Sequence, residues 1–206
     1  MDILILIRVP AILIALTVHE LAHGLVAKYY GDITAEQEGR LTLNPLSHLD
    51  VLGTLMLFFG PFGWAKPVPV NPAYFADPKR DMALVAFAGP LSNVFLAAVS
   101  GLFFRFGLVS PGSVFAAFLY ISFMINIGLA VFNLLPVYPL DGSRILMAFL
   151  NGNHYRNYLA AMKVVPLVFI GMITVEWLFH IPVISVLLNP IFDPAVKIAK
   201  TVFMGN

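Results

Sequence analysis

The sequence predicts an all-α polytopic membrane protein with about five to six transmembrane segments and a re-entrant or short β-hairpin element after the first helix. Two observations predict this class. Hydrophobic residues make up 60% of the 206 residues and charged residues only 11%, whereas about 25% of the residues of a soluble domain are charged. Several apolar runs also approach the roughly 20 residues that cross a bilayer. Residues 1–206 are therefore expected to form a single membrane domain.

The first apolar run covers residues 3–30 and ends at Gly31-Asp32, a pair that is typical of a helix stop. The run contains several polar side chains, which are unusual in a span and are considered below. Residues 32–50 are polar. Within them, residues 41–43 are a candidate short strand.

Residues 51–64 are apolar, but three glycines and a proline interrupt them. The segment is too short and too broken for a regular span, which favours a re-entrant element. Residues 66–72 contain three prolines and are expected to be extended, because proline fixes φ and restricts the residue before it.

Further spans are expected at residues 82–104, 114–135 and 164–179. Between the last two, residues 138–163 are interpreted as a polar turn and loop. A last apolar segment begins at residues 182–188, is interrupted by Asn-Pro and Asp-Pro pairs, and is followed by a surface amphipathic helix.

The net charge argues against a nucleic-acid partner, and the cysteine content limits the kinds of cross-link and metal ligand. The formal net charge is only +1, and nucleic-acid binding requires a clustered basic face, so no nucleic-acid partner is expected. The absence of cysteine excludes disulfides and thiolate metal ligands.

The first apolar run contains His19-Glu20-Leu21-Ala22-His23. Residues four apart share a helix face, so His19 and His23 could bind one Zn²⁺ at about 2.0–2.1 Å. Glu20 could then act as the general base for a water beside the metal. The five-residue pattern is common by chance. Burying charges in a span costs about 2.5–3.5 kcal/mol each, however, which favours function over a structural polar cluster.

A catalytic zinc usually has a third protein ligand, and Asp141, Glu176 and His180 are the candidates at membrane depth. Asp141 is favoured because an apolar helix there meets two prolines and then Asp-Gly. The prolines break the helix and Gly142 permits a tight bend. A broken helix is tolerated at membrane depth where it lines a cavity. The alternative is an ordinary loop aspartate at a helix end.

Asn133 lies just inside the same helix break. Its amide could donate a hydrogen bond to a substrate carbonyl and polarise it, or it could cap backbone groups that the break sets free. The first role is favoured. Three other side chains are interpreted as mainly structural or solvated: Glu176 in a span, His48 near the re-entrant segment and His154 in a polar loop.

The pairing of His-Glu-x-x-His with the later Asn133-x-x-Pro136-x-x-x-Leu140-Asp141-Gly142 resembles the site-2 protease family of intramembrane zinc metalloproteases. A third element of the resemblance is Gly89-Pro90-Leu91-Ser92-Asn93, in the span between them. The matches bracket residues 19–142, in the right order. One departure is Ser143, where many members have a second glycine.

The resemblance implies that His19, His23 and Asp141 are the ligands of one Zn²⁺ and that Glu20 is the general base. It also implies Asn133 as a substrate or oxyanion contact, and Pro136 as a weaker candidate for substrate binding. The implied activity is hydrolysis of peptide bonds in or near the transmembrane segment of a single-pass membrane protein or peptide. A compact member without a PDZ or CBS domain is expected.

The metal site also constrains the topology. For His19 and Asp141 to meet, the first and third spans must run in the same direction, which requires that residues 51–64 do not cross. That arrangement puts ten cations on one side and one on the other, with Arg8 in the membrane, a positive-inside asymmetry. The ten are Lys28, Arg40, Lys66, Lys79, Arg80, Arg144, Arg156, Lys163, Lys197 and Lys200.

The expected location is therefore a bacterial or archaeal cell membrane, with the active site toward the cytosol. The rival class is a metal transporter or channel that uses the same His and Asp cluster, and it predicts polar residues along the spans as a route. A catalytically inactive adaptor is disfavoured because Glu20 is present. A homo-oligomer is compatible with the sequence, but no feature of the sequence supports it.

Overall fold

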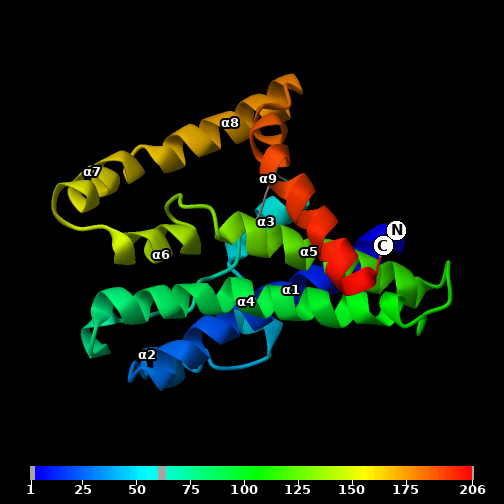
Figure 1. Ribbon diagram of the computed structural model, residues 1–206, viewed down its shortest axis with the longest axis horizontal. Coiled ribbons are helices and arrows are strands. Elements are labelled where there is room, and N and C mark those ends of the chain that lie inside the picture. Colours follow the sequence, from blue (N-terminus) through cyan, green and yellow to red (C-terminus); the bar gives the residue numbers. More distant parts are fainter. Residues whose placement is uncertain (1–2, 60–63, 206) are drawn as a thin grey trace.

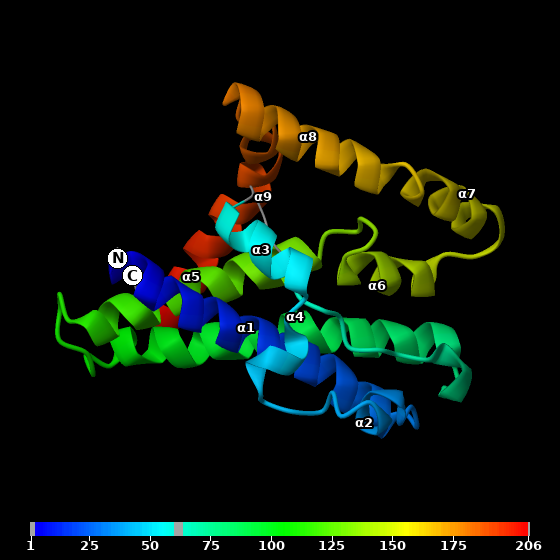
Figure 2. The same cartoon turned by 180° about the vertical axis from the view of Figure 1, so that it is seen from behind.

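The protein is described by a computed structural model that covers residues 3–59 and 64–205. At its centre, three long helices lie side by side: α1 (Ile3–Tyr29), α4 (Pro78–Arg105) and α5 (Val114–Asn133). Figure 1, and the view from behind in Figure 2, show that α1 and α5 run in the same direction and α4 runs against them. The shared direction of the first and third predicted spans is therefore present.

Small residues let these helices approach closely. The interfaces bury Ala11, Ala15, Ala86, Ala97 and Ala130. Small side chains at helix contacts are typical of membrane bundles, because there is no water whose exclusion could drive helices together and van der Waals contact has to do so.

Four helical stretches in the described residues are long and apolar enough to cross a membrane. They are Leu4–Tyr29, Pro78–Arg105, Val114–Asn133 and Gly152–Phe179. The mostly helical membrane class is thus confirmed. Five to six spans stay a prediction, since α3 (Val51–Phe59) has nine residues and α9 (Val183–Ala199) has 17.

A polar connection follows α1 and holds the short helices α2 (Thr34–Gln37) and η1 (Pro45–His48) before α3. Residues 41–43 form no strand, and neither do residues 68–70, which are extended without a β partner among the described residues. One antiparallel bridge joins Leu49 to Ala65, and the Lys66 amide donates to the His48 carbonyl at 2.9 Å. The two ends of the 51–64 segment therefore lie together, although residues 60–63 are outside the described part.

The second half of the chain contains more helix than the sequence predicts. The expected loop at 138–163 is wrong, because it forms α6 (Asp141–Phe149) and α7 (Gly152–Met162). The expected interruptions after residue 188 are also wrong. Helix α9 runs through Pro190 and Pro194 and continues into a π-helical turn, η3 (Lys200–Met204).

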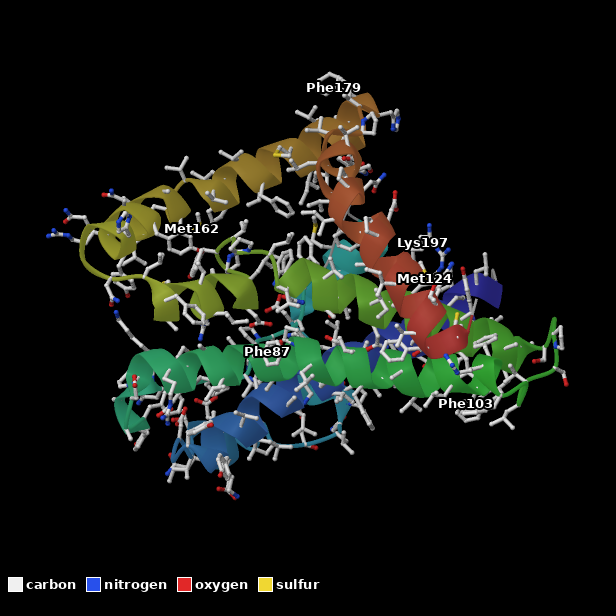
Figure 3. All side chains as sticks on the ribbon, in the orientation of Figure 1. Phe87, Phe103, Met124, Met162, Phe179 and Lys197 are labelled. Carbon is white, nitrogen blue, oxygen red and sulfur yellow. The ribbon has the colours of Figure 1, made fainter. Side chains whose placement is uncertain are left out.

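Helices α8 (Val165–Phe179) and α9 form a hairpin that turns at His180, which adopts a left-handed φ of 55°. The turn lies between the span expected at residues 164–179 and the apolar segment expected to begin at residues 182–188. Figure 3 shows Phe179 at the tip of this hairpin, far from the three central helices. The C-terminal part of α9 and η3 return to α4 and α5, where Ala199 and Met204 join a core cluster with Ala97, Phe123 and Ile127.

Candidate metal centre

The buried side chains of His19 and His23 project from one face of α1, one turn apart. Their Nε2 atoms lie 3.0 Å apart. Asp141, the first residue of α6, brings its Oδ2 to 3.2 Å from His19 Nε2 and 3.3 Å from His23 Nε2. The structure thus brings together the three ligands that the sequence predicts, with their ligand atoms within 4.8 Å of one another.

The chemistry of this donor set fits a metal ion. Both Nδ1 atoms are already engaged: His19 Nδ1 lies 2.7 Å from Asn93 Oδ1, and His23 Nδ1 lies 2.7 Å from the Val85 carbonyl. Both partners are oxygens that accept, so each ring carries its proton on Nδ1 and leaves Nε2 bare. Asp141 Oδ2 is buried and has no hydrogen bond of good geometry. Two imidazoles and one carboxylate are a common catalytic zinc set.

The charge of Asp141 suits this role. Burial raises the pKa of its carboxyl, and the two imidazole rings lower it, to about 2, when they carry protons on Nε2. A metal ion bound between the three groups would supply the positive charge in place of those protons, since a carboxyl binds a metal in its ionised form.

Two glycines make this approach possible. A Cβ at Gly89 would lie 2.4 Å from His23 Nε2 and 2.6 Å from His19 Cε1. A Cβ at Gly142 would lie 2.2 Å from the Leu134 carbonyl oxygen. Gly142 therefore serves close packing of the first turn of α6 on the end of α5, rather than the tight bend expected from the sequence. At Ser143, the buried hydroxyl donates to the Leu140 carbonyl at 2.7 Å.

A cavity of about 150 Å³ opens beside the three ligands. Glu20 lines it, and Glu20 Oε2 accepts a hydrogen bond from the Val68 amide at 2.8 Å. The remaining lining comes from the extended segment, from α4, α5 and α6, and from the loop before α6: Pro67, Val68, Val70, Val85, Ala86, Asn133, Pro139 and Arg144.

Asn133 also lines the cavity, but its Nδ2 donates to the Leu129 carbonyl of its own helix at 3.0 Å. This contact joins residues four apart within α5. Pro136 is exposed and is not among the lining residues, and its carbonyl accepts from the Tyr158 hydroxyl at 2.9 Å.

The other candidates lie elsewhere. Glu176 accepts from the Ile184 amide at 2.7 Å and the Ser185 hydroxyl at 2.9 Å, so it caps the start of α9. His48 is buried and its Nε2 lies 2.9 Å from the Thr42 carbonyl. His180 forms the hairpin turn, and His154 is exposed on α7.

The polar contacts around the site are not apparent from the sequence motifs. Asn126, fully buried in α5, accepts from Asn93 at 2.8 Å. Asp32 accepts from the Asn71 amide at 2.6 Å, and Arg40 donates to the Lys66 carbonyl at 2.8 Å. A signal for Asn126 existed, since an amide inside an apolar span is costly and usually has a role.

Fold and site together define a polytopic membrane protein with a His-His-Asp cluster that could hold a metal ion. The family model "Peptidase family M50" matches residues 108–175. Proteins named "Putative zinc metalloprotease" are similar to the chain. YwhC of Bacillus subtilis is 43% identical over 67% of the chain and 66% of its own length. Rip2 of Mycobacterium tuberculosis is 32% identical over 84% of the chain and 73% of its own length.

The protein belongs to peptidase family M50, which confirms the resemblance to site-2 proteases. MJ0611 of Methanocaldococcus jannaschii is 37% identical over 62% of both chains. The chain thus spans slightly less than two thirds of YwhC and MJ0611. No solved structure matches the chain.

Proposed function

We propose that this protein is a zinc-dependent endopeptidase that cleaves peptide bonds in or near the transmembrane segments of membrane proteins. One observation carries the proposal: a buried carboxylate oxygen without a hydrogen bond faces two bare imidazole nitrogens, and Glu20 lines the same cavity. This arrangement lies within a bundle of apolar helices, and the relatives are named as zinc metalloproteases.

In this proposal, His19, His23 and Asp141 hold one Zn²⁺. The ion supplies a Lewis acid that polarises a carbonyl and acidifies water. The Nδ1 contacts to Asn93 and Val85 orient the two rings and fix which nitrogen is free to bind.

Glu20 is the proposed general base. It accepts a proton from the attacking water while the water oxygen bonds to the peptide carbonyl carbon. It then gives a proton to the amide nitrogen as the C–N bond breaks. The Val68 amide holds Oε2 at 2.8 Å and so keeps the carboxylate beside the cavity.

Asn133 is the proposed hydrogen-bond donor to the developing oxyanion. To act so, its amide must leave the Leu129 carbonyl, to which it now donates at 3.0 Å. Pro136, three residues further on, is proposed to contact the substrate near the same helix end.

The substrate is proposed to be a single-pass membrane protein or peptide, locally unwound, since a helix hides its carbonyls in hydrogen bonds. Pro67, Val68 and Val70 line the cavity on an extended segment. This segment is the proposed edge against which an extended peptide binds by β-augmentation.

For topology, we propose that residues 51–64 dip into the bilayer and return, in a single membrane domain. The bridge between Leu49 and Ala65 supports this, since the segment then starts and ends at the same place. The distribution of Lys and Arg favours a site toward the cytosol. The homologues named as metalloproteases favour the enzyme over the metal-transporter alternative.

The test compares purified wild type, Glu20→Gln and the control Glu38→Gln, which changes an exposed side chain. All three should bind about one zinc per chain. Cleavage of a labelled transmembrane peptide should fall roughly 10²–10⁴-fold in Glu20→Gln alone. Equal cleavage by Glu20→Gln and wild type would overturn the mechanism. Zinc flux into proteoliposomes without cleavage would favour the transporter.

A further inference from the structure

Three buried side chains form a continuous chain of hydrogen bonds that ends at His19. Ser122 and Asn126 belong to α5 and Asn93 to α4, and the exposed fraction of each is at most 7%. The proposed zinc ligand on α1 is thus connected through α4 to α5 by hydrogen-bonded side chains. An amide placed this deep in an apolar bundle is costly unless every donor and acceptor is satisfied.

The direction of each hydrogen bond in this series follows from Ser122, the residue farthest from His19. The Ser122 carbonyl can only accept, so the group of Asn126 that lies 2.9 Å from it is the Nδ2 donor. Asn126 Oδ1 therefore faces Asn93 and accepts from its Nδ2 at 2.8 Å. The same Nδ2 also donates to the Ala15 carbonyl at 3.2 Å, a second group that can only accept.

Two acceptors therefore fix the orientation of the Asn93 amide and leave its Oδ1 toward His19. Across 2.7 Å, that oxygen can only accept, so His19 Nδ1 must donate. The ring proton is then on Nδ1, and the lone pair of Nε2 points at His23 and Asp141. The tautomer of His19 is determined by a side chain.

His23 is held differently. Its Nδ1 faces the Val85 carbonyl at 2.7 Å, a main-chain acceptor that no substitution of a side chain removes. Of the two histidines, only His19 depends on a side-chain amide, that of Asn93, whose oxygen and nitrogen would exchange places if it flipped. That amide is in turn held by a second side chain, Asn126.

We propose that Asn93 is a positioning residue that holds His19 as its Nδ1–H tautomer, and that Asn126 locks the orientation of Asn93. The proposal rests on the proposed zinc ligation but not on proteolysis. Neither asparagine lines the cavity beside Glu20. Both are therefore expected to act on the metal through His19 alone.

The test measures the zinc affinity of purified protein by competition with a chelator. Asn93→Leu should weaken zinc binding about 10–100-fold, as loss of an outer-shell partner typically does. Asn126→Leu should weaken it less, because the Ala15 carbonyl still orients Asn93. Asn93→Asp, which keeps an acceptor for Nδ1–H, should retain most of the affinity. Ser122→Ala is the matched control, since it keeps the main-chain carbonyl that accepts from Asn126 Nδ2 at 2.9 Å and removes only the longer contact of Nδ2 with the Ser122 hydroxyl at 3.3 Å.

A spectroscopic readout separates positioning from general damage. In wild-type apoprotein labelled with ¹⁵N-histidine, the His19 signals, identified by their loss in His19→Gln, should be those of the Nδ1–H tautomer. In Asn93→Leu they should show a mixture of tautomers. If Asn93→Leu does not fold, Asn93→Asp and Asn126→Leu decide by the same measurements.

Zinc affinity within twofold of wild type in a folded Asn93→Leu, or an unchanged His19 tautomer, would overturn the proposal. So would zinc affinity in Asn93→Asp as low as in Asn93→Leu. A zinc-loaded wild type that cleaves no membrane peptide would overturn the proposed function and leave this inference standing.

Discussion

At the scale of single residues, the centre depends on the absence of a side chain. Helix α4 passes so close to the two imidazoles that only hydrogen fits at position 89. Both rings are held at Nδ1, by Asn93 and by the Val85 carbonyl. They therefore cannot turn away from an added methyl group without giving up a hydrogen bond.

Gly89→Ala should therefore lower zinc occupancy and the unfolding temperature, since overpacking a tight site costs about 1–3 kcal/mol. Gly171→Ala is the matched control. Gly171 also lies inside a helix, α8, and a Cβ there meets no atom within 4 Å. Zinc content measured by elemental analysis should fall in the first variant only. Full zinc occupancy in Gly89→Ala would show that α4 can move away from α1.

At the scale of elements, side chains attach the extended segment that follows α3 to two other parts of the chain. These parts are α1 and the polar connection between α1 and α3. Arg40 binds the Lys66 carbonyl, Glu20 binds the Val68 amide and Asp32 binds the Asn71 amide. These contacts satisfy backbone groups that a neighbouring strand would satisfy in a sheet. The segment is thus held beside the cavity without a β-sheet in the described residues.

Val68→Pro removes the one amide that binds Glu20 and should lower peptide cleavage about tenfold with zinc content unchanged, because Glu20 loses its orientation. Val68→Ala keeps the amide and should stay near wild type. The comparison separates the backbone group from the side chain. Equal cleavage by both variants would mean that the Val68 contact does not matter for Glu20.

The same segment shows what the sequence can and cannot predict. The apolar runs at 3–30, 82–104 and 114–135 predicted α1, α4 and α5 to within a few residues, because bilayer length limits them. The strand expected at residues 41–43 did not form. The backbone partners of the extended segment are the side chains of Arg40, Glu20 and Asp32, which are distant in sequence, and nothing local reveals them.

Helix α9 gives the opposite case. Pro190 and Pro194 predicted an interruption, yet the helix is continuous. In an apolar environment a break frees several backbone groups at once, which costs more than the bonds that proline removes.

For the site, the motifs predicted that His19, His23 and Asp141 meet. The partner of Asn93 depends on which faces of α4 and α5 touch, and that is decided by packing.

At the scale of the whole molecule, the centre joins distant parts of the chain. Two of the proposed ligands lie on α1 and the third on α6, and the first turn of α6 packs Gly142 against the end of α5. By contrast, Ile173 is the one buried residue among those described in α7 and α8. The core of α1, α4, α5 and α6 is therefore the part that a bound ion would stabilise.

Removal of zinc should lower the unfolding temperature of the wild type. At a free zinc concentration 100-fold above Kd, binding contributes about 2.7 kcal/mol to the free energy of unfolding. Asp141→Asn should show little response to a chelator, because it lacks one ligand. Asp193→Asn, an exposed change on α9, should respond like the wild type. An identical response of Asp141→Asn and wild type would contradict the ligand assignment.

The way in which His19, His23 and Glu20 are held has an evolutionary consequence. The supports of His23 and Glu20 are the Val85 carbonyl and the Val68 amide, which every amino acid offers except that proline has no amide. These two contacts would therefore survive a change of side chain at position 85 or 68 among descendants of this chain, provided that 68 does not become proline, although packing limits both buried positions. Position 93 has no such freedom, because the group that accepts from His19 is the side-chain oxygen of Asn93.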